Sequence, residues 1–286
     1  MMKVKAELVY SAGNTLGEGP FAVSGTKIHW FDIFESSVFR FDTSGGGIEK
    51  IDLDHFLCCA GETVDHTVIA AGEKGVMLLD DKFEIIRIIS PPPFDTEVQR
   101  FNDGKAGPDG AFWAGSMSYD GDKPIGGLYR FGNGVSRVID GMLIPNGLGW
   151  SPDGTTMYIT DSGKGQITQW DFDAGSGVIS NERPFISAAA DEGVPDGLAV
   201  DEQGNIWSAC WGGRRIKGFD PDGSLFAEIT VEAVNPTSCC FGGPDHRSLF
   251  ITSARHGLEK PGPSDGALFK ADTGTRGPAP CLFSFI

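Results

Sequence analysis

Residues 146–159, Asn-Gly-Leu-Gly-Trp-Ser-Pro-Asp-Gly-Thr-Thr-Met-Tyr-Ile, decide the fold. Two short apolar runs, 148–150 and 157–159, flank the sequence Ser-Pro-Asp-Gly. Pro fixes a backbone angle suited to the first corner of a turn, and Asp-Gly readily adopts the conformations that complete it. The stretch therefore predicts a β-hairpin whose first strand begins at a polar residue, Asn146.

The same hairpin pattern recurs along the chain, with further copies that begin at Glu18, Asn102 and Asp196. A glycine follows eight residues after Asn102, Asn146 and Asp196, and seven residues after Glu18, at Gly25. Weaker copies near residues 58 and 236 complete a series of six with a spacing of roughly 45 residues. Six units of three or four strands predict an all-β, six-bladed β-propeller that occupies residues 1–286 as one domain. A β-sandwich or a β-helix is the alternative for short, evenly spaced strands.

The charge of the chain restricts its partners. The 286 residues carry a formal net charge of −16, and the longest basic cluster is the pair Arg214-Arg215. A strongly acidic chain repels phosphate backbones and anionic lipid surfaces, so no nucleic-acid or membrane partner is expected. No apolar run approaches the length that a membrane-spanning helix needs.

The cysteines point to a reducing compartment. Four of the six form the adjacent pairs Cys58-Cys59 and Cys239-Cys240, and no CxxC spacing occurs. Most lie in apolar runs, so buried, reduced thiols are expected. The N-terminal segment MMKVKAELVYSAGN lacks the apolar stretch of a signal peptide, which favours a cytoplasmic protein. A monomer or a weak homo-oligomer is expected.

The polar residues that begin the repeats are chemically alike, because Glu18, Asn102, Asn146 and Asp196 offer only carboxylate and amide groups. Inner strands of a propeller line its central channel, so these residues are expected to meet at one end of it. Ca²⁺, Mg²⁺ and Mn²⁺ prefer oxygen ligands, and two clustered carboxylates repel each other unless a cation lies between them. Asn-Gly and Asp-Gly also occur in ordinary turns, which is the alternative interpretation of any one position.

Six segments, in order along nearly the whole chain, carry a family resemblance. On them the chain resembles the senescence marker protein/gluconolactonase/luciferin-regenerating-enzyme family of regucalcin-like sugar lactonases. The resemblance implies a six-bladed propeller, in agreement with the repeat count. The segments are Leu16–Pro20, Arg100–Lys105, Trp113–Met117, Ile144–Gly154, Pro195–Leu198 and Cys240–Asp245.

The resemblance also implies a role for particular residues. It assigns Glu18, Asn146 and Asp196 as the ligands of one divalent metal ion, and Arg100 and Asn102 as substrate contacts. Counting along the chain places a further acidic substrate contact at Asp120, in the loop 118–124, which departs from the regucalcin pattern. Because the family uses several divalent metals, the resemblance does not select one. Ca²⁺ is the expected ion, with Zn²⁺, Mn²⁺, Mg²⁺ or Fe²⁺ as alternatives.

These residues suggest a hydrolase. The expected reaction is the metal-dependent hydrolysis of a sugar lactone, an aldonolactone, to the aldonic acid, with Asp196 as the candidate general base. The same Lewis-acid chemistry would serve an esterase or a phosphotriesterase, and a calcium-binding propeller without catalysis is the third alternative.

Overall fold

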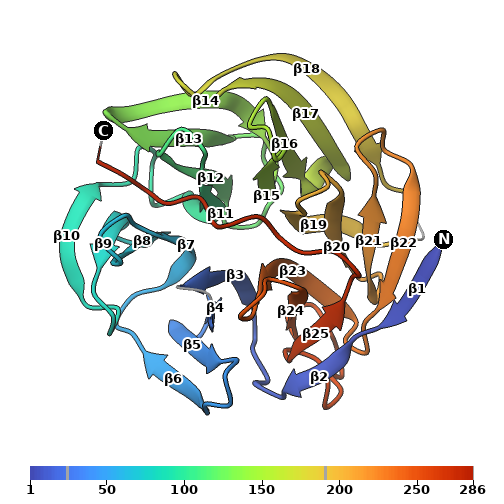
Figure 1. Ribbon diagram of the computed structural model, residues 1–286. Helices are drawn as coiled ribbons and strands as arrows, with labels where there is room; N and C mark the ends of the chain where they lie inside the picture. Colours follow the sequence, from blue (N-terminus) through green and yellow to red (C-terminus); the bar gives the residue numbers. More distant parts are fainter. Residues whose placement is uncertain (24–25, 190–191, 286) are drawn as a thin grey trace.

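Six sheets surround a central axis in the computed structural model, and each sheet runs outward from an inner strand (Figure 1). All strand pairs within them are antiparallel except one at the outer edge of the fifth sheet. The structure describes residues 1–23, 26–189 and 192–285. Gly25, which the repeat pattern assigns to the first hairpin turn, lies outside these residues. The predicted six-bladed β-propeller is confirmed, and each inner strand begins within a few residues of a predicted repeat start.

The first three blades have four strands each, numbered outward from the channel. Blade 1 comprises β3 (Gly17–Val23), β4 (Lys27–Asp32), β5 (Ser37–Asp42) and β6 (Ile48–Asp52); blade 2 comprises β7 (Leu57–Glu62), β8 (Val68–Gly72), β9 (Gly75–Leu79) and β10 (Ile85–Ser90); blade 3 comprises β11 (Gln99–Ala106), β12 (Phe112–Ser118), β13 (Gly126–Gly132) and β14 (Gly134–Met142).

The last three blades follow the same order, and two of them take their outermost strand from the N-terminus. Blade 4 comprises β15 (Pro145–Trp150), β16 (Thr156–Asp161), β17 (Gln166–Asp173) and β18 (Val178–Ser187), with a 3₁₀ turn at Ser162–Lys164; blade 5 comprises β19 (Val194–Val200), β20 (Ile206–Trp211), β21 (Arg215–Phe219), β22 (Leu225–Thr230) and β1 (Met2–Lys5); blade 6 comprises β23 (Asn235–Gly242), β24 (Ser248–Ala254), β25 (Leu268–Asp272) and β2 (Glu7–Tyr10).

The N-terminal strands close the ring of blades. Strand β2 pairs antiparallel with β25, where Leu8 lies opposite Phe269, and β1 pairs parallel with β22, where Val4 lies opposite Ile229. The chain thus brings its first residues to the outer edges of its last two blades (Figure 1). The exposed edges of β22 and β25 are covered in this way, which protects them from pairing with other chains.

Tryptophans on the second strands anchor three of the blades. Trp30, Trp113 and Trp207 lie on β4, β12 and β20, and all three are fully buried. Each indole N–H still finds an acceptor, and Trp113 and Trp207 use the carboxylates of Asp109 and Asp201 at 3.1 Å. A buried indole contributes a large apolar area, and its satisfied N–H avoids the cost of an unpaired donor.

A β-bulge interrupts every inner strand near its start. In β11, β15 and β19 the first bulged residues are Asn102, Asn146 and Asp196, and each is followed by a second bulged residue. Two residues then oppose one on the neighbouring strand, which turns the local side chains away from the regular alternation. The bulge therefore explains how adjacent polar residues can both be buried around the channel.

The glycines after Asn146 and Asp196 serve close packing rather than a turn. A Cβ atom added to Gly147 would lie 2.3 Å from the backbone nitrogen of Leu198, in the next blade. A Cβ atom added to Gly197 would lie 2.0 Å from Ser238 Oγ. Only glycine lets neighbouring inner strands come this close. Asn146-Gly147 and Asp196-Gly197 are therefore not turns, which was the alternative interpretation of these dipeptides.

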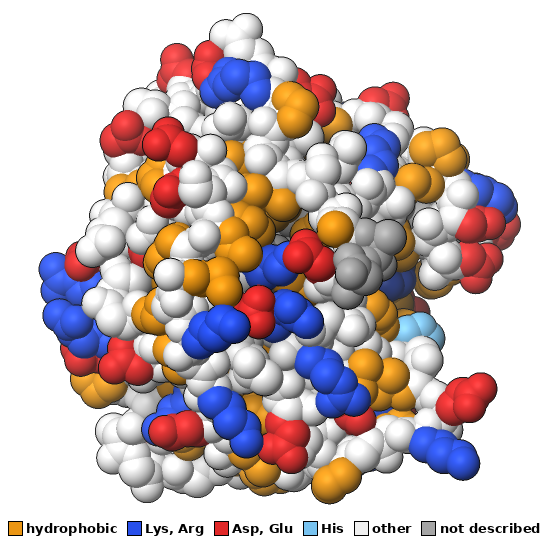
Figure 2. Space-filling view, turned by 90° about the vertical axis from the view of Figure 1, so that its right-hand side faces the viewer, with side chains coloured by type: hydrophobic (Ala, Val, Ile, Leu, Met, Phe, Trp, Pro, Cys, Tyr) orange, Lys and Arg blue, Asp and Glu red, His pale blue; other side chains and the backbone are white. Residues whose placement is uncertain are grey.

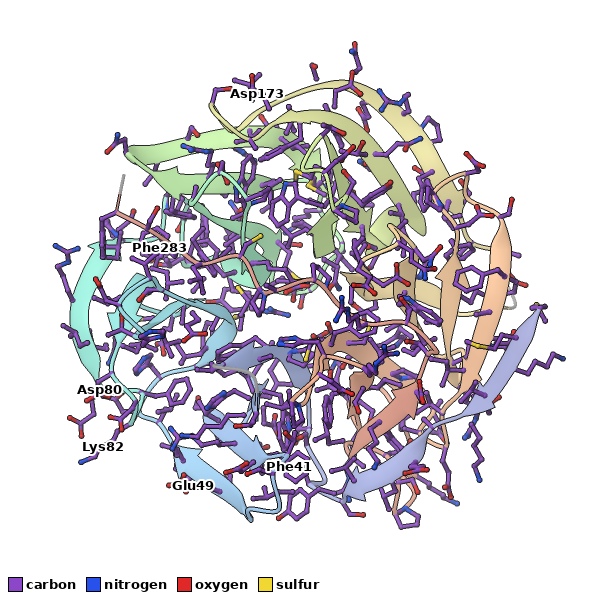
Figure 3. All side chains as sticks on the ribbon, viewed as in Figure 1. Phe41, Glu49, Asp80, Lys82, Asp173 and Phe283 are labelled. Atoms are coloured by element: carbon purple, nitrogen blue, oxygen red, sulfur yellow. The ribbon has the colours of Figure 1, made fainter. Side chains whose placement is uncertain are left out.

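The surface carries both signs of charge. Lys and Arg side chains are interspersed with Asp and Glu over the face seen in Figure 2. Glu49, Lys82 and Asp173 lie at the outer edge of the blades, whereas Phe283 lies farther in (Figure 3). Within the described residues, no helix has the length and hydropathy to cross a bilayer.

Candidate functional site

The four polar residues that begin the repeats lie at the same end of the channel, because each stands at the start of an inner strand. We call Glu18, Asn102, Asn146 and Asp196 the channel ring; their exposed fractions are 7%, 9%, 6% and 4%. Glu18 departs from the shared register, since its blade has Gly19 at the first bulged position and Glu18 one residue earlier. The seven-residue spacing to Gly25 is the sequence signal of this offset.

Burial and mutual repulsion perturb the carboxylates of the channel ring. Burial is the main reason that the pKa of Glu18 is raised to about 8, and the nearby charge of Asp103 adds to it. The Gly19 N–H, which donates to Glu18 Oε2 at 2.9 Å, and the Arg100 guanidinium oppose this rise. The pKa of Asp196 is raised well above its usual range by burial and then by the charges of Glu18 and Asp103. A cation between these groups would relieve both causes.

Asp103 is a third buried carboxylate that the sequence reasoning missed. It follows Asn102 in the bulge of β11, is 8% exposed, and accepts a hydrogen bond from the Gly104 N–H at 2.7 Å. Its own pKa is raised by burial, against the lowering influence of Lys105. The signal was present in the segment Arg100–Lys105, but only the leading residue Asn102 was taken as a candidate for the channel.

The side chains of Asn146 and Asp196 each hold one oxygen without a partner. Asn146 Nδ2 donates to Ser162 Oγ at 3.2 Å, and Ser162 Oγ donates to the Pro195 carbonyl at 2.8 Å. Asn146 also lies close enough to lower the pKa of Asp196. Within the described part of the chain, Asn146 Oδ1 and Asp196 Oδ1 are buried with no hydrogen-bond donor. Unsatisfied buried oxygens are costly, and a bound cation would satisfy both.

The proposed ligands Glu18, Asn146 and Asp196 offer two carboxylates and one amide oxygen, a combination that suits a hard divalent cation. Among residues 1–23, 26–189 and 192–285, no three His, Cys, Asp or Glu side chains lie close enough together to hold a metal ion. The set of Glu18, Asn146 and Asp196 includes only two such side chains, so the Asn146 carbonyl oxygen is needed to complete it. Oxygen ligands of this kind suit Ca²⁺, Mg²⁺ and Mn²⁺ better than a soft metal.

Arg100 and Asn102 form a preset pair beside this set. Arg100 Nη1 donates to Asn102 Oδ1 at 2.9 Å and to the Phe101 carbonyl at 2.9 Å. Asn102 Nδ2 donates to the Pro145 carbonyl at 3.1 Å, next to Asn146. Arg100 itself is 8% exposed. Each side chain keeps hydrogen-bonding capacity beyond these contacts, because guanidinium has five N–H groups and the amide has a second N–H.

Asp120 is placed differently from the other predicted contacts. It lies in the loop between β12 and β13, at the same end of blade 3 as Arg100, which pairs with Met117 on β12. Its side chain is exposed. The following Gly121 packs toward Ile144, just before β15. A substrate contact by Asp120 therefore stays a prediction. Its loop lies at the end of blade 3 that also carries Arg100.

Two further residues occupy the bulges of the remaining blades. Cys58 is the bulged residue of β7, and its Sγ donates to the Phe101 carbonyl at 3.1 Å. Burial raises the pKa of this thiol to about 12. The nearby charge of Arg100 lowers this pKa, and that of Glu18 raises it further. Thr237 is the first bulged residue of β23 and donates to the Gly17 carbonyl at 2.5 Å. All six cysteines are unpaired, five of them buried and Cys281 half-buried.

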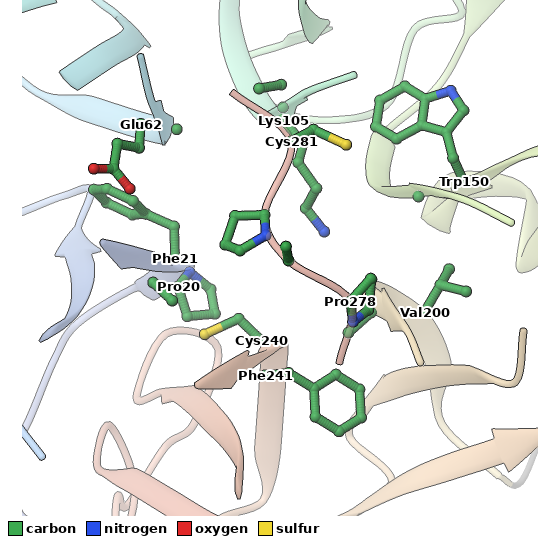
Figure 4. Close-up of a pocket in the computed structure, with 18 of the residues that line it drawn as sticks. Pro20, Phe21, Glu62, Lys105, Trp150, Val200, Cys240, Phe241, Pro278 and Cys281 are labelled. Atoms are coloured by element: carbon green, nitrogen blue, oxygen red, sulfur yellow. The ribbon is translucent and has the colours of Figure 1, made fainter. Parts of the chain in front are cut away.

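A cavity of about 270 Å³ lies at the other end of the channel (Figure 4). It is lined by the later residues of all six inner strands and by residues 278–281. Of the described residues that line it, Gly19 and Asp103 directly follow members of the channel ring in sequence, while Glu18, Asn146 and Asp196 are outside the lining. The cavity and the candidate metal site are therefore different places along one axis.

Comparisons with known proteins agree with this architecture. A family model described as the SMP-30/gluconolactonase/LRE-like region matches residues 16–255. Regucalcin of Xenopus laevis is 30% identical and aligns over 99% of this chain and 100% of its own length. YvrE of Bacillus subtilis (strain 168), whose name assigns it provisionally as a sugar lactone lactonase, is 30% identical over 94% of this chain and 95% of its own.

A solved structure extends the similarity to three dimensions. The calcium-binding protein regucalcin from Agrobacterium tumefaciens superposes with a TM-score of 0.92 at 27% identity, covering 99% of this chain and 98% of that one. The family model covers most of the chain and includes Glu18, Arg100, Asn102, Asp120, Asn146 and Asp196. The chain belongs to the SMP-30/gluconolactonase/LRE-like family.

Proposed function

We propose that this protein hydrolyses a sugar lactone to the corresponding aldonic acid and that one divalent cation, bound by Glu18, Asn146 and Asp196, is required. The observation that carries the proposal is the pair of buried oxygens without donors, on Asn146 and Asp196, beside the raised pKa of Glu18. The family membership and the name of YvrE support the lactone as the substrate class.

Asp196 and Asn146 have different proposed roles in the reaction. When bound, the cation supplies Lewis-acid polarisation of the lactone carbonyl and favours ionisation of water. Asp196 holds the attacking water and accepts its proton, or orients the water if the cation lowers the basicity of the carboxylate. Asn146 keeps Asp196 in place through the bonds that join Asn146 to Ser162 and Ser162 to Pro195.

Arg100 and Asn102 are proposed to hold the hydroxyl groups of the sugar. Their mutual hydrogen bond fixes both side chains before substrate binds, so little conformational freedom is lost on binding. The positive charge of Arg100 also favours the negative charge that develops on the carbonyl oxygen. Asp120 is proposed as an additional hydroxyl acceptor from the rim.

Ca²⁺ is the proposed ion, because every donor is a hard oxygen and the Agrobacterium relative is named a calcium-binding protein. Mn²⁺ and Mg²⁺ accept the same donors, and Zn²⁺ and Fe²⁺ are the remaining alternatives. The unpaired cysteines support a reducing compartment, and we propose the cytoplasm.

A pH-indicator assay separates the candidate functions. The purified protein is offered aldonolactones, aryl esters and phosphotriesters, each with a divalent cation and with chelator. Acid release from lactones alone, lost with chelator and in Asp196→Ala, is the expected result. Asp245→Asn is the matched control, since it removes an exposed carboxylate from the distant turn between β23 and β24. Lactone turnover by Asp196→Ala at the wild-type rate would refute the proposal. If the wild type binds the cation but turns over none of these substrates, it is a cation-binding protein and not an enzyme of these classes.

A further inference from the structure

The cavity opposite the channel ring combines apolar walls with one half-buried cationic group. Phe21, Trp150, Val200, Phe241 and Pro278 form much of its wall (Figure 4). Its volume of about 270 Å³ exceeds the roughly 150 Å³ of an apolar protein cavity that takes up benzene. A six-membered ring with one or two small substituents therefore fits the space.

Lys105 brings a positive charge into this cavity. Its side chain comes from β11, points toward the centre of the cavity, and is half-buried (Figure 4). Nζ donates to the Leu198 carbonyl at 3.1 Å, across the channel in blade 5. None of the ion pairs among the described residues includes Lys105, whose ammonium group has three N–H donors in total. The charge of Lys105 also acts on Asp103, whose pKa it lowers. A half-buried ammonium group with unused donors beside apolar walls is a recognition element for an acceptor group.

Two acidic residues also line the cavity, and their positions set the orientation of a ligand. Asp103 precedes Lys105 by two residues on β11, so it lies deeper, toward the channel ring. Glu62 stands at the end of β7 and is engaged with His66, whose Nδ1 lies 2.8 Å from Glu62 Oε1. A ligand with one anionic group would place it at Lys105 and its apolar body against the aromatic and aliphatic walls.

The C-terminal segment covers the outer mouth of the cavity. It crosses the face of the propeller from blade 6 toward blade 2 (Figure 1). One end is held where Gly277 N–H donates to the His246 carbonyl at 2.9 Å. The other end is held by the buried Phe283, whose N–H donates to the Glu62 carbonyl at 2.9 Å.

The middle of this segment, residues 278–282, borders the cavity, and Cys281 packs against buried hydrophobic residues of the core. Among the described residues, 278–282 make no backbone hydrogen bond to the blades. Pro278, Ala279, Pro280 and Leu282 are exposed. These exposed residues place the outer mouth of the cavity at the protein surface, where a small molecule would enter.

We propose that this cavity is a second ligand site, separate from the channel ring, for a small aromatic or branched aliphatic carboxylate whose carboxylate group pairs with Lys105. The pairing adds charge-assisted hydrogen bonds to the apolar contacts. The site stands whether or not the lactonase proposal holds, because none of the proposed metal ligands lines the cavity.

Calorimetric titration with two probes of nearly equal shape tests the proposal. One probe is 4-methylbenzoate and the other is the neutral 4-methylbenzyl alcohol. Chelator is present throughout, so that binding of the carboxylate to a metal ion does not contribute. We expect one benzoate per chain, with affinity at least tenfold higher than that of the alcohol. We expect Lys105→Met to remove that preference, whereas Asp196→Ala and Arg100→Met retain it.

Alkylation of Cys281 gives an independent readout of the same site. Cys281 lines the cavity and is half-buried, whereas the other five thiols are buried. Bound 4-methylbenzoate is expected to slow alkylation of Cys281 several-fold in the wild type and to have no effect in Lys105→Met. Equal binding of both probes, loss of binding in Arg100→Met instead of Lys105→Met, or no binding of either probe would overturn the proposal. A thermal melt of Lys105→Met verifies that the variant is folded.

Discussion

Replacing Glu18 with Gln should make the metal-free protein more stable at neutral pH while weakening its affinity for a divalent cation. Gln keeps the shape of Glu18 and can still accept the Gly19 N–H. It removes a fully buried carboxylate whose pKa is raised from 4.5 to about 8 by burial and by Asp103. Without a metal ion, the wild type must hold this group either protonated or charged at a buried site where Arg100 only partly offsets the cost, and both cost free energy above pH 4.5.

The expected size follows from the linkage between protonation and folding. The folded state binds the proton more tightly than the unfolded state, so stability decreases as pH rises from about 4.5 to about 8. Each pH unit in that window costs about 1.4 kcal/mol, which gives about 3 kcal/mol at pH 7. Below pH 4.5 the group is protonated in both states and the penalty disappears. Glu18→Gln removes the penalty, so its advantage should be near zero at pH 4 and largest above pH 7.

Urea unfolding with chelator at pH 4, 5.5, 7 and 8.5 measures this advantage directly. A parallel series with saturating Ca²⁺ or Mn²⁺ should reverse the order, because the wild type gains more from the cation. Asp245→Asn controls for the loss of one negative charge from an acidic surface. If Glu18→Gln is less stable than the wild type in chelator at pH 7, or gains equally from the cation, the electrostatic account of the ring is wrong.

Three other changes probe other parts of the account. Asp103→Asn should weaken cation binding several-fold in calorimetry, since it removes a nearby negative charge without removing a ligand. Unchanged affinity would mean that Asp103 does not contribute to cation binding. Gly197→Ala should cost about 1–3 kcal/mol in urea unfolding, because its Cβ would meet Ser238 Oγ, and a neutral result would mean that the inner strands can separate freely. Phe283→Ala should cost about 3–5 kcal/mol and speed proteolysis of the C-terminal segment, and protease resistance equal to that of the wild type would contradict the anchoring.

The propeller and its ring were predictable because they repeat. Asn102, Asn146 and Asp196 share a spacing to a later glycine, and the structure places each at the first bulged position of an inner strand. The seven-residue spacing after Glu18 was visible, but its structural meaning was not, because a one-residue offset is evident only from the strand pairing.

Other features depend on contacts that no local pattern encodes. Asp103 was missed because the repeat alignment singles out the leading residue Asn102, and only the bulge shows that the next residue is buried beside it. Cys58 was recognised as a buried thiol, but not as a neighbour of Arg100 and Glu18. The segment 273–285 has no strand periodicity, so its path across the channel depends on distant anchors such as the Glu62 carbonyl.

The central claim is that Glu18, Asn146 and Asp196 together hold one cation that lactone hydrolysis requires. Titration with Mn²⁺, followed by electron paramagnetic resonance and by lactone turnover on the same samples, measures both quantities at once. We predict one bound Mn²⁺ per chain, turnover that rises in proportion to occupancy, and loss of both in Asn146→Ala and Asp196→Ala but not in Asp245→Asn. Stoichiometric binding that survives in both ring variants, or full turnover in chelator, would contradict the claim.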